Sequence, residues 1–177
     1  ITILGLDMYS TFDGGDTWQT TVPPWWDYSV HADKHDLVYV DENSIIIATD
    51  GGLYRSDDNM ATWFDIENIH NSQFYRIGIN PHNPGTYTGG AQDNGTTTGN
   101  LSVENNWFRD YGGDGFQPVY DPDISDYWYT GTQNGNLVFF DGSDWNGFTG
   151  GIDSEDRNNW DTPLIMSAPS SEVLYTG

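Results

Sequence analysis

The chain has 177 residues, of which 27 are acidic and 5 are basic, so its formal net charge at pH 7 is −22. Such a surface repels nucleic acid and anionic lipid headgroups, which argues against nucleic acid as a partner. The lack of cysteine excludes disulfides and Cys-ligated zinc, and no apolar run approaches the roughly 20 residues of a membrane helix, so we expect no membrane insertion.

Strands and turns are predicted from end to end. Short runs of β-branched and aromatic residues lie between clusters of Gly, Asn and Asp, and helix signals are almost missing. Turn-forming pairs such as Asp50-Gly51, Asn94-Gly95 and Asn134-Gly135 separate these runs. In chain order, the predicted strands are 37–40, 44–49, 53–56, 62–66, 74–79, 116–120, 127–131, 137–141 and 163–167.

The chain also repeats at a nearly constant interval. Trp18, Trp63, Trp107 and Trp145 are separated by 45, 44 and 38 residues. A period of roughly 40 to 50 residues that holds about four strands is typical of a β-propeller blade. We therefore predict an all-β fold, a β-propeller with about four consecutive four-stranded blades. Tandem small domains are the alternative, but an all-β unit this short, without disulfides or metal, hardly folds alone.

Both ends of the sequence match the middle of a blade. The segment Met8–Thr11 corresponds to Leu53–Ser56, and Val173–Gly177 corresponds to the strand that precedes that point in a blade. We expect residues 1–177 to be propeller blades that form part of a larger propeller, in a longer chain. A ring of four blades closed by pairing the two ends is the alternative.

One motif has a definite turn chemistry. In the segment Thr11–Trp18, a hydroxyl and a carboxylate can accept hydrogen bonds from the amides of their own turn, and Gly15 suits a positive φ. A near copy follows at Ser56–Trp63, in which Met60 replaces the glycine and predicts a looser turn. The residues that form the two motifs are Thr11, Asp13, Gly15, Thr17, Trp18, Ser56, Asp58, Thr62 and Trp63.

This pattern resembles the Asp-box, or BNR repeat, of propellers such as sialidases, xyloglucan-active glycosidases and sortilin-like receptors. The segments 31–36, 50–56, 73–78, 92–96 and 112–116 look most like secreted bacterial multidomain propeller proteins. The resemblance implies the fold, an extracellular or cell-surface setting, a structural role for the Asp-box residues and other domains of the same chain as partners. It does not imply an activity, because one propeller architecture hosts enzymes, receptors and scaffolds.

Several polar residues are predicted to lie where blades begin. His31, Asp33, His35 and Asp36 precede the strand 37–40, and Asp114 precedes the strand 116–120. Since the first strand of a blade lines the central channel, these side chains are candidates for one common site. With Asp50 and Asp93 from matching turns, Asp33 and Asp114 could bind Ca²⁺, which prefers oxygen ligands. The alternative is that each side chain only satisfies nearby loop amides.

Two classes of function remain open. The first is a non-catalytic extracellular module for adhesion, scaffolding or recognition of a polysaccharide or a surface protein, with His31, His35, Trp25, Trp26 and Arg76 as ligand-binding candidates. The second is a glycoside hydrolase, with Asp114 as the best acid or base and Asp33 as the next. A sialidase is disfavoured because only four arginines are present and none are close in sequence.

A cofactor is not required by any of these features. Acidic loops at 121–123 and 153–156 suit Ca²⁺, and bound calcium would relieve the repulsion within a chain of charge −22. Nonspecific screening by salt is the alternative explanation for how such a chain stays compact.

Overall fold

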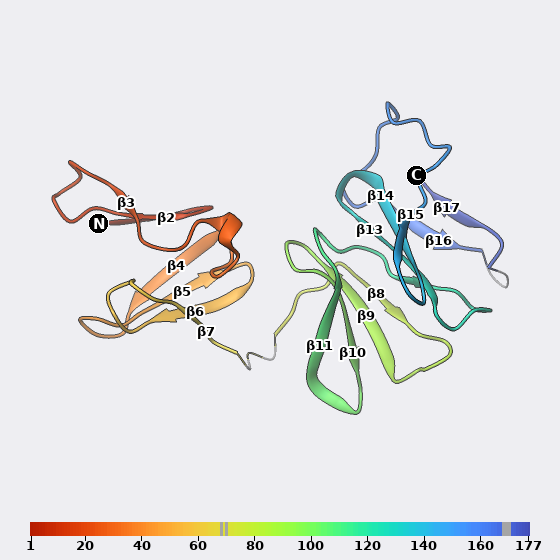
Figure 1. Cartoon of the computed structure of the whole chain (residues 1–177), viewed down its shortest axis with the longest axis horizontal. Helices are drawn as coiled ribbons and strands as arrows, with labels where there is room; N and C mark the ends of the chain where they lie inside the picture. The colour runs from red at the N-terminus through yellow and green to blue at the C-terminus, as the bar shows by residue number, and fades with distance from the viewer. Residues whose placement is uncertain (68, 70, 168–170) are drawn as a thin grey trace. The chain divides into compact units, whose positions relative to one another are not determined.

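The computed structural model describes residues 1–67, 69, 71–167 and 171–177, and the chain forms two compact units (Figure 1). Unit 1 is Ile1–His70 and unit 2 is Asn71–Gly177. Apart from two short 3₁₀ turns, η1 (Trp25–Asp27) and η2 (Gln133–Gly135), the described residues form only strands, turns and loops. No helix in this part of the chain is long and apolar enough to cross a bilayer.

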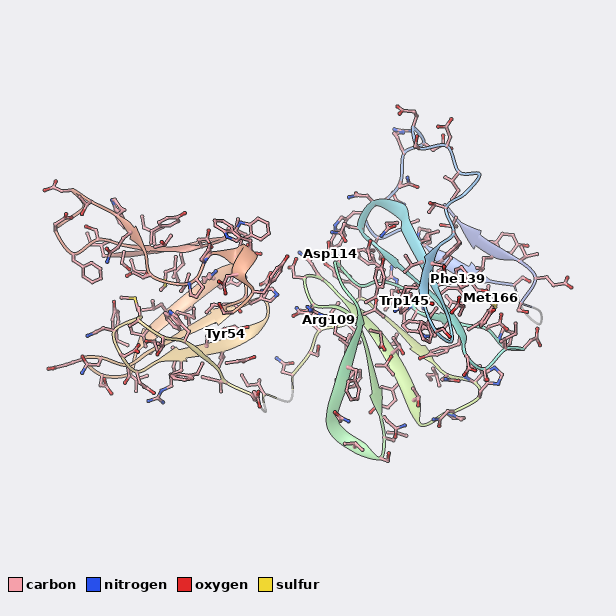
Figure 2. All side chains as sticks on the ribbon, viewed as in Figure 1. Tyr54, Arg109, Asp114, Phe139, Trp145 and Met166 are labelled. Atoms are coloured by element: carbon pink, nitrogen blue, oxygen red, sulfur yellow. The ribbon has the colours of Figure 1, made fainter. Side chains whose placement is uncertain are left out.

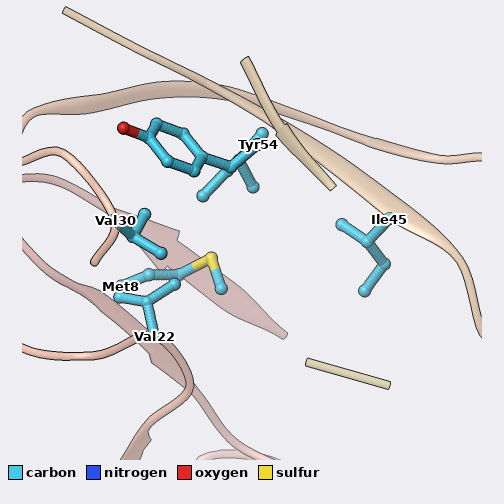
Figure 3. Close-up of a cluster of buried hydrophobic side chains, with 6 residues drawn as sticks. Met8, Val22, Val30, Ile45 and Tyr54 are labelled. Atoms are coloured by element: carbon cyan, nitrogen blue, oxygen red, sulfur yellow. The ribbon is translucent and has the colours of Figure 1, made fainter. Parts of the chain in front are cut away.

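Unit 1 consists of two antiparallel sheets in which the spatial order of the strands is their order along the chain. The three-stranded sheet holds β1 (Thr2–Leu4), β2 (Met8–Ser10) and β3 (Gln19–Thr20), and the four-stranded sheet holds β4 (Lys34–Tyr39), β5 (Ile45–Thr49), β6 (Gly52–Ser56) and β7 (Phe64–Asp65). A core of buried side chains from both sheets and their connection joins them (Figure 3). It is formed by Met8, Val22, Val30, Ile45, Ile47 and Tyr54.

Unit 2 repeats the same arrangement. One four-stranded sheet holds β8 (Arg76–Ile79), β9 (Thr86–Ala91), β10 (Gly95–Asn100) and β11 (Val103–Tyr111). The next holds β12 (Val119–Tyr120), β13 (Tyr127–Thr132), β14 (Asn136–Asp141) and β15 (Trp145–Gly147), and a two-stranded sheet holds β16 (Leu164–Met166) and β17 (Leu174–Thr176). Its most deeply buried apolar side chains include Phe116, Leu137 and Leu164.

Four-stranded antiparallel sheets with consecutive strands as neighbours are the blades of a β-propeller. The predicted all-β propeller fold is confirmed. Within unit 1 the repeat also holds in detail, because Ser10 pairs with Gln19, one residue after Trp18, and Arg55 pairs with Phe64, one residue after Trp63. In unit 2, Trp107 lies within β11 and Trp145 begins β15. Trp63 lies between the two sheets of unit 1, where its indole N–H donates to the carbonyl of Thr21 at 3.1 Å.

Each predicted strand overlaps a strand of the structure, but several bounds differ and some strands, such as β9, β10 and β11, were not predicted. Strand β4 begins at Lys34 instead of residue 37, so His35 and Asp36 lie within the strand and do not precede it. Residues 116–118 lie outside β12, because Pro118 has no N–H to donate to a ladder, although Phe116 still donates to the carbonyl of Gly131. Strand β10 was missed since its interior is threonine and glycine.

A side-chain cap ends the first strand of each complete blade. The side-chain oxygens of Asp41, Asn80 and Asp121 each accept backbone N–H bonds from the residues two and three positions later, at 2.8 to 3.1 Å. These Asx turns direct the chain into the second strand of the blade.

Two glycines allow the backbone to approach itself closely within unit 2. The segment 112–118 passes between the β9–β10 turn and β13, where Gly115 donates to the carbonyl of Ala91 at 2.8 Å. A Cβ atom on Gly115 would lie 2.1 Å from the carbonyl oxygen of Gly95, and one on Gly90 would lie 2.1 Å from that of Phe116. Only glycine fits either position without moving the backbone.

Candidate functional site

The turn at Thr11–Trp18 is held by its own side chains. The Asp13 carboxylate accepts the backbone N–H of Thr17 at 3.0 Å and the hydroxyls of Thr17 and Thr11, while the Thr11 hydroxyl accepts the N–H of Gly15 at 2.9 Å. These hydrogen bonds, those from Thr17 first, stabilise the carboxylate and lower the pKa of Asp13 far below its usual range. Both carboxylate oxygens of Asp13 are therefore engaged within the turn.

The second copy of this turn is as well formed as the first. Met60, in the glycine position, adopts a positive φ of 70°, and its N–H donates to Ser56 Oγ at 2.9 Å. Asp58 accepts the backbone N–H of Thr62 at 2.8 Å and its hydroxyl at 2.6 Å, bonds that lower the pKa of Asp58. The looser turn expected from Met60 was wrong, because the hydrogen bonds hold a methionine in the left-handed region despite the strain.

The histidines of the predicted site belong to unit 1. His35 is mostly exposed on β4, and its Nε2 is hydrogen bonded to Asp50 on the β5–β6 turn. The ring of His31 lies over Gly51, where a Cβ would come within 2.3 Å of it. Asp33 has a positive φ of 56° and its backbone N–H donates to the carbonyl of Leu6.

The lone lysine of the chain is buried between the two sheets of unit 1. Lys34 is only 3% exposed, and its ammonium group donates to the carbonyl of Leu6 at 2.8 Å and lies 3.9 Å from Asp7. Desolvation lowers the pKa of Lys34, opposed by the charges of Asp7 and Asp33. This side chain ties the β1–β2 connection to the start of β4.

Asp114 joins three segments of unit 2. It is 9% exposed, and one carboxylate oxygen accepts the backbone N–H of Asp93 at 2.8 Å, in the β9–β10 turn. Its own N–H donates to the side-chain carbonyl of Gln133, at the start of η2, at 3.0 Å. Asp114 thus links equivalent turns of two adjacent blades. Figure 2 marks its place in unit 2.

The predicted calcium ligands are divided between the units. Asp33 and Asp50 belong to unit 1, and Asp93 and Asp114 belong to unit 2. Calcium usually takes six to eight oxygen ligands, and the one Asp114 oxygen described above already accepts an amide. A calcium site formed by all four residues stays a prediction.

Arg76, at the start of β8, is held by an ion pair. One of its guanidinium nitrogens donates to Asp161 at 2.6 Å and another to the carbonyl of Tyr75 at 3.1 Å. The neighbouring ring of Trp160 packs edge-on against Phe116 and Tyr75, with centroids 4.8 and 5.5 Å away. These contacts anchor the loop that precedes β16 onto β8.

An exposed group of aromatic side chains lies on the connection between β3 and β4. We call the segment Trp25–Tyr28 the aromatic turn. Trp26 and Tyr28 are 62% and 81% exposed, and Trp25, also exposed, meets Trp26 edge-on with ring centroids 5.8 Å apart. The sequence predicted the two tryptophans as ligand-binding candidates but not Tyr28, whose positive φ of 62° has no sequence signal.

No protein-family model matches the sequence, and neither does any of the curated proteins. Among solved structures, the chain is similar to an ancestral GH74 enzyme, with 16% identity over 97% of this chain and 24% of that one, at a TM-score of 0.45. It is also similar to YCF48 bound to a D1 peptide, with 13% identity over 96% of this chain and 68% of that one, at a TM-score of 0.45. A GH74 enzyme of Niastella koreensis has 14% identity over 82% of this chain and 27% of that one, at a TM-score of 0.33.

The chain therefore spans about a quarter of the GH74 enzymes and about two thirds of YCF48. Likenesses at these identities and TM-scores carry neither a substrate nor a partner over to this chain.

Proposed function

We propose that this chain is a non-catalytic Asp-box propeller module of an extracellular or cell-surface protein, and that it recognises glycans through the aromatic turn. The observation that carries the proposal is the exposure of Trp25, Trp26 and Tyr28 together on one short segment. Aromatic rings are costly to leave in water and present flat apolar surfaces with a polar edge, which suits contact with sugar rings.

The aromatic turn is fixed before any ligand arrives. Val22 and Val30, on either side of it, are buried in the core of unit 1. Within it, the N–H of Trp25 donates to the Asp7 carboxylate at 3.0 Å, and the N–H of Asp27 donates to the carbonyl of Pro24 at 2.9 Å. A segment anchored at both ends loses little conformational entropy on binding, which favours affinity.

The left-handed backbone of Tyr28 supports the same reading. A bulky residue with positive φ costs about 1 to 2 kcal/mol, and strain of this kind concentrates at functional sites. The strained residue is also among the most exposed aromatic residues of the chain. Its ring contributes nothing to the core, so packing does not explain why a tyrosine occupies the position.

The environment of Asp114 favours a binding module over a glycoside hydrolase. A glycosidase holds two carboxyl groups roughly 5 to 9.5 Å apart across an open cleft. Asp114, the best acid or base by sequence, is nine-tenths buried and accepts a backbone amide of the adjacent blade. We read this carboxylate as a link between two turns.

Binding to a panel of neutral and anionic polysaccharides tests the proposal. Trp26→Ala and Tyr28→Gly, the latter chosen because glycine tolerates the positive φ, should weaken binding at least tenfold, since each removes on the order of 100 Å² of apolar contact. Phe12→Ala is the matched control, because Phe12, 72% exposed, is a similarly exposed aromatic residue outside the aromatic turn. Equal binding by all four proteins, or no binding at all, contradicts the aromatic turn as a glycan site.

The same panel tests the enzyme alternative. Reducing ends released by the wild type should stay at the blank level over hours. Turnover that disappears in Asp114→Asn, in protein whose circular dichroism and melting temperature are unchanged, would establish a glycoside hydrolase instead.

A further inference from the structure

Unit 2 contains an open cavity between the β13–β14 turn and the long loop that follows β15. It has a volume of about 240 Å³. Its lining residues are 134–136 in the turn and, in the loop, Thr149, Ile152, Asp153, Ser154 and Asn158. The contact that brings these two segments together is tight: a Cβ on Gly135 would lie 2.7 Å from the side chain of Asn158. The backbone N–H of Asn134 also donates to the carbonyl of Trp160 at 3.2 Å.

The cavity lining is rich in polar groups that carry no formal charge. Side-chain amides come from Asn134, Asn136 and Asn158, and hydroxyls from Thr149 and Ser154. Within the described part of the chain, the side chains of Asn134, Thr149 and Ser154 make no hydrogen bond to another residue. They are therefore available to donate to, and accept from, a ligand.

The rest of the lining restricts the ligand further. Ile152, 41% exposed, adds an apolar contact, and Asp153 is the one carboxylate among the described lining residues, none of which is Lys or Arg. An anionic ligand would meet a negative group and no cationic side chain among the described lining residues, in a chain of net charge −22. A single carboxylate is also too few for calcium, which prefers several.

From this lining we infer that the cavity binds one neutral sugar residue, at the end or a branch of a glycan. Paired hydroxyls of a sugar match amide and hydroxyl side chains that both donate and accept, and Ile152 covers part of the apolar ring face. The volume is below the roughly 300 to 1,000 Å³ of pockets for drug-sized ligands, which limits the cavity to one such residue. This inference rests on the proposed glycan recognition and adds a second subsite, in unit 2.

The cavity is tested by measuring the binding of neutral methyl glycosides to the intact chain with ligand-observed NMR. Thr149→Val keeps the shape and removes the hydroxyl, and Asn134→Gly removes the amide at a position whose φ of 62° glycine accepts. Each variant should raise the Kd about fivefold, and the two together at least tenfold, as expected for lost neutral hydrogen bonds. Thr20→Val, on the exposed strand β3 of unit 1, is the control and should leave the Kd unchanged.

The outcomes separate this inference from the proposed function. Glycan binding that falls in Trp26→Ala but is unchanged in Thr149→Val and Asn134→Gly overturns the cavity site and leaves the aromatic turn in place. Loss in the cavity variants, with the control unaffected, supports the site. A chain that binds uronic or sulfated glycosides more tightly than neutral ones overturns the assignment of ligand charge, and a chain that binds no glycan overturns both proposals.

Discussion

The substitution Gly115→Ala probes the close backbone approach on which unit 2 depends. A Cβ at this position would lie 2.1 Å from the carbonyl oxygen of Gly95, so the two backbones must separate by about 0.9 Å to reach the 3.0 Å that real contacts respect. Both atoms in the clash belong to the backbone, so no side chain can rotate away. Overpacking of this kind costs about 1 to 3 kcal/mol, and weakening the 2.8 Å hydrogen bond from Gly115 to Ala91 adds about 1 kcal/mol.

A loss of about 2 to 4 kcal/mol should lower the melting temperature of unit 2 by about 8 to 16 °C, at about 4 °C per kcal/mol for a domain of this size. Gly112→Ala, three residues away, is the control: a Cβ there meets nothing within 4 Å, and its φ is not positive. Thermal unfolding followed by circular dichroism, with hydrogen exchange of β12 and β13 to identify the unit, measures both variants. Equal melting temperatures for the two variants would refute the packing described for residues 112–118.

Three further outcomes follow from the structure. Gly15→Ala, at a φ of 110° with no atom near its Cβ, should destabilise unit 1 by about 1 to 2 kcal/mol through backbone strain alone, measured by chemical denaturation. The pKa of Asp13 is lower in the folded state than in the unfolded state, where it is about 3.9. The contribution of this carboxylate to folding stability is therefore fully present above about pH 3.9 and is lost progressively as the pH falls below that value. The melting temperature should therefore fall more steeply between pH 6 and pH 3 for the wild type than for Asp13→Asn. Parallel curves of melting temperature against pH for the two proteins would contradict this. Ile47→Ala, fully buried, should cost about 2 to 5 kcal/mol, whereas exposed Val38→Ala should stay within about 0.5 kcal/mol of the wild type.

The repeat and the turns could be predicted because local chemistry determines them. In unit 1, a tryptophan one residue before the last strand of the sheet, and a hydroxyl and a carboxylate two residues apart, act within a few positions of the chain. Strand β10 was missed for the opposite reason. Its threonines replace apolar packing with hydroxyl pairs to other strands, such as Thr96 with Thr130 and Thr88 with Thr98, and these partners are set by the tertiary fold.

In the candidate site, too, the features set by local sequence could be predicted and those set by tertiary contacts could not. Trp25 and Trp26 could be identified because Pro23-Pro24 mark an exposed connection. The backbone of Tyr28, the burial of Asp114 and the beginning of β4 depend on contacts with distant residues. The cavity of unit 2 could not be predicted at all, because its lining residues lie in the segments 134–136 and 149–158, which no motif relates. The boundary between the units, after residue 70, likewise was not predicted from the sequence.

The central claim, glycan recognition by the aromatic turn, is tested most directly by the indole N–H signals in a ¹H–¹⁵N NMR titration. The chain has 8 tryptophans, and single Trp→Phe variants assign their signals. Titration with a glycan that binds should shift the signals of Trp25 and Trp26 in proportion to saturation, while that of Trp63, between the sheets of unit 1, stays in place. Saturation of the protein with glycan without movement of the Trp25 and Trp26 signals would contradict the account.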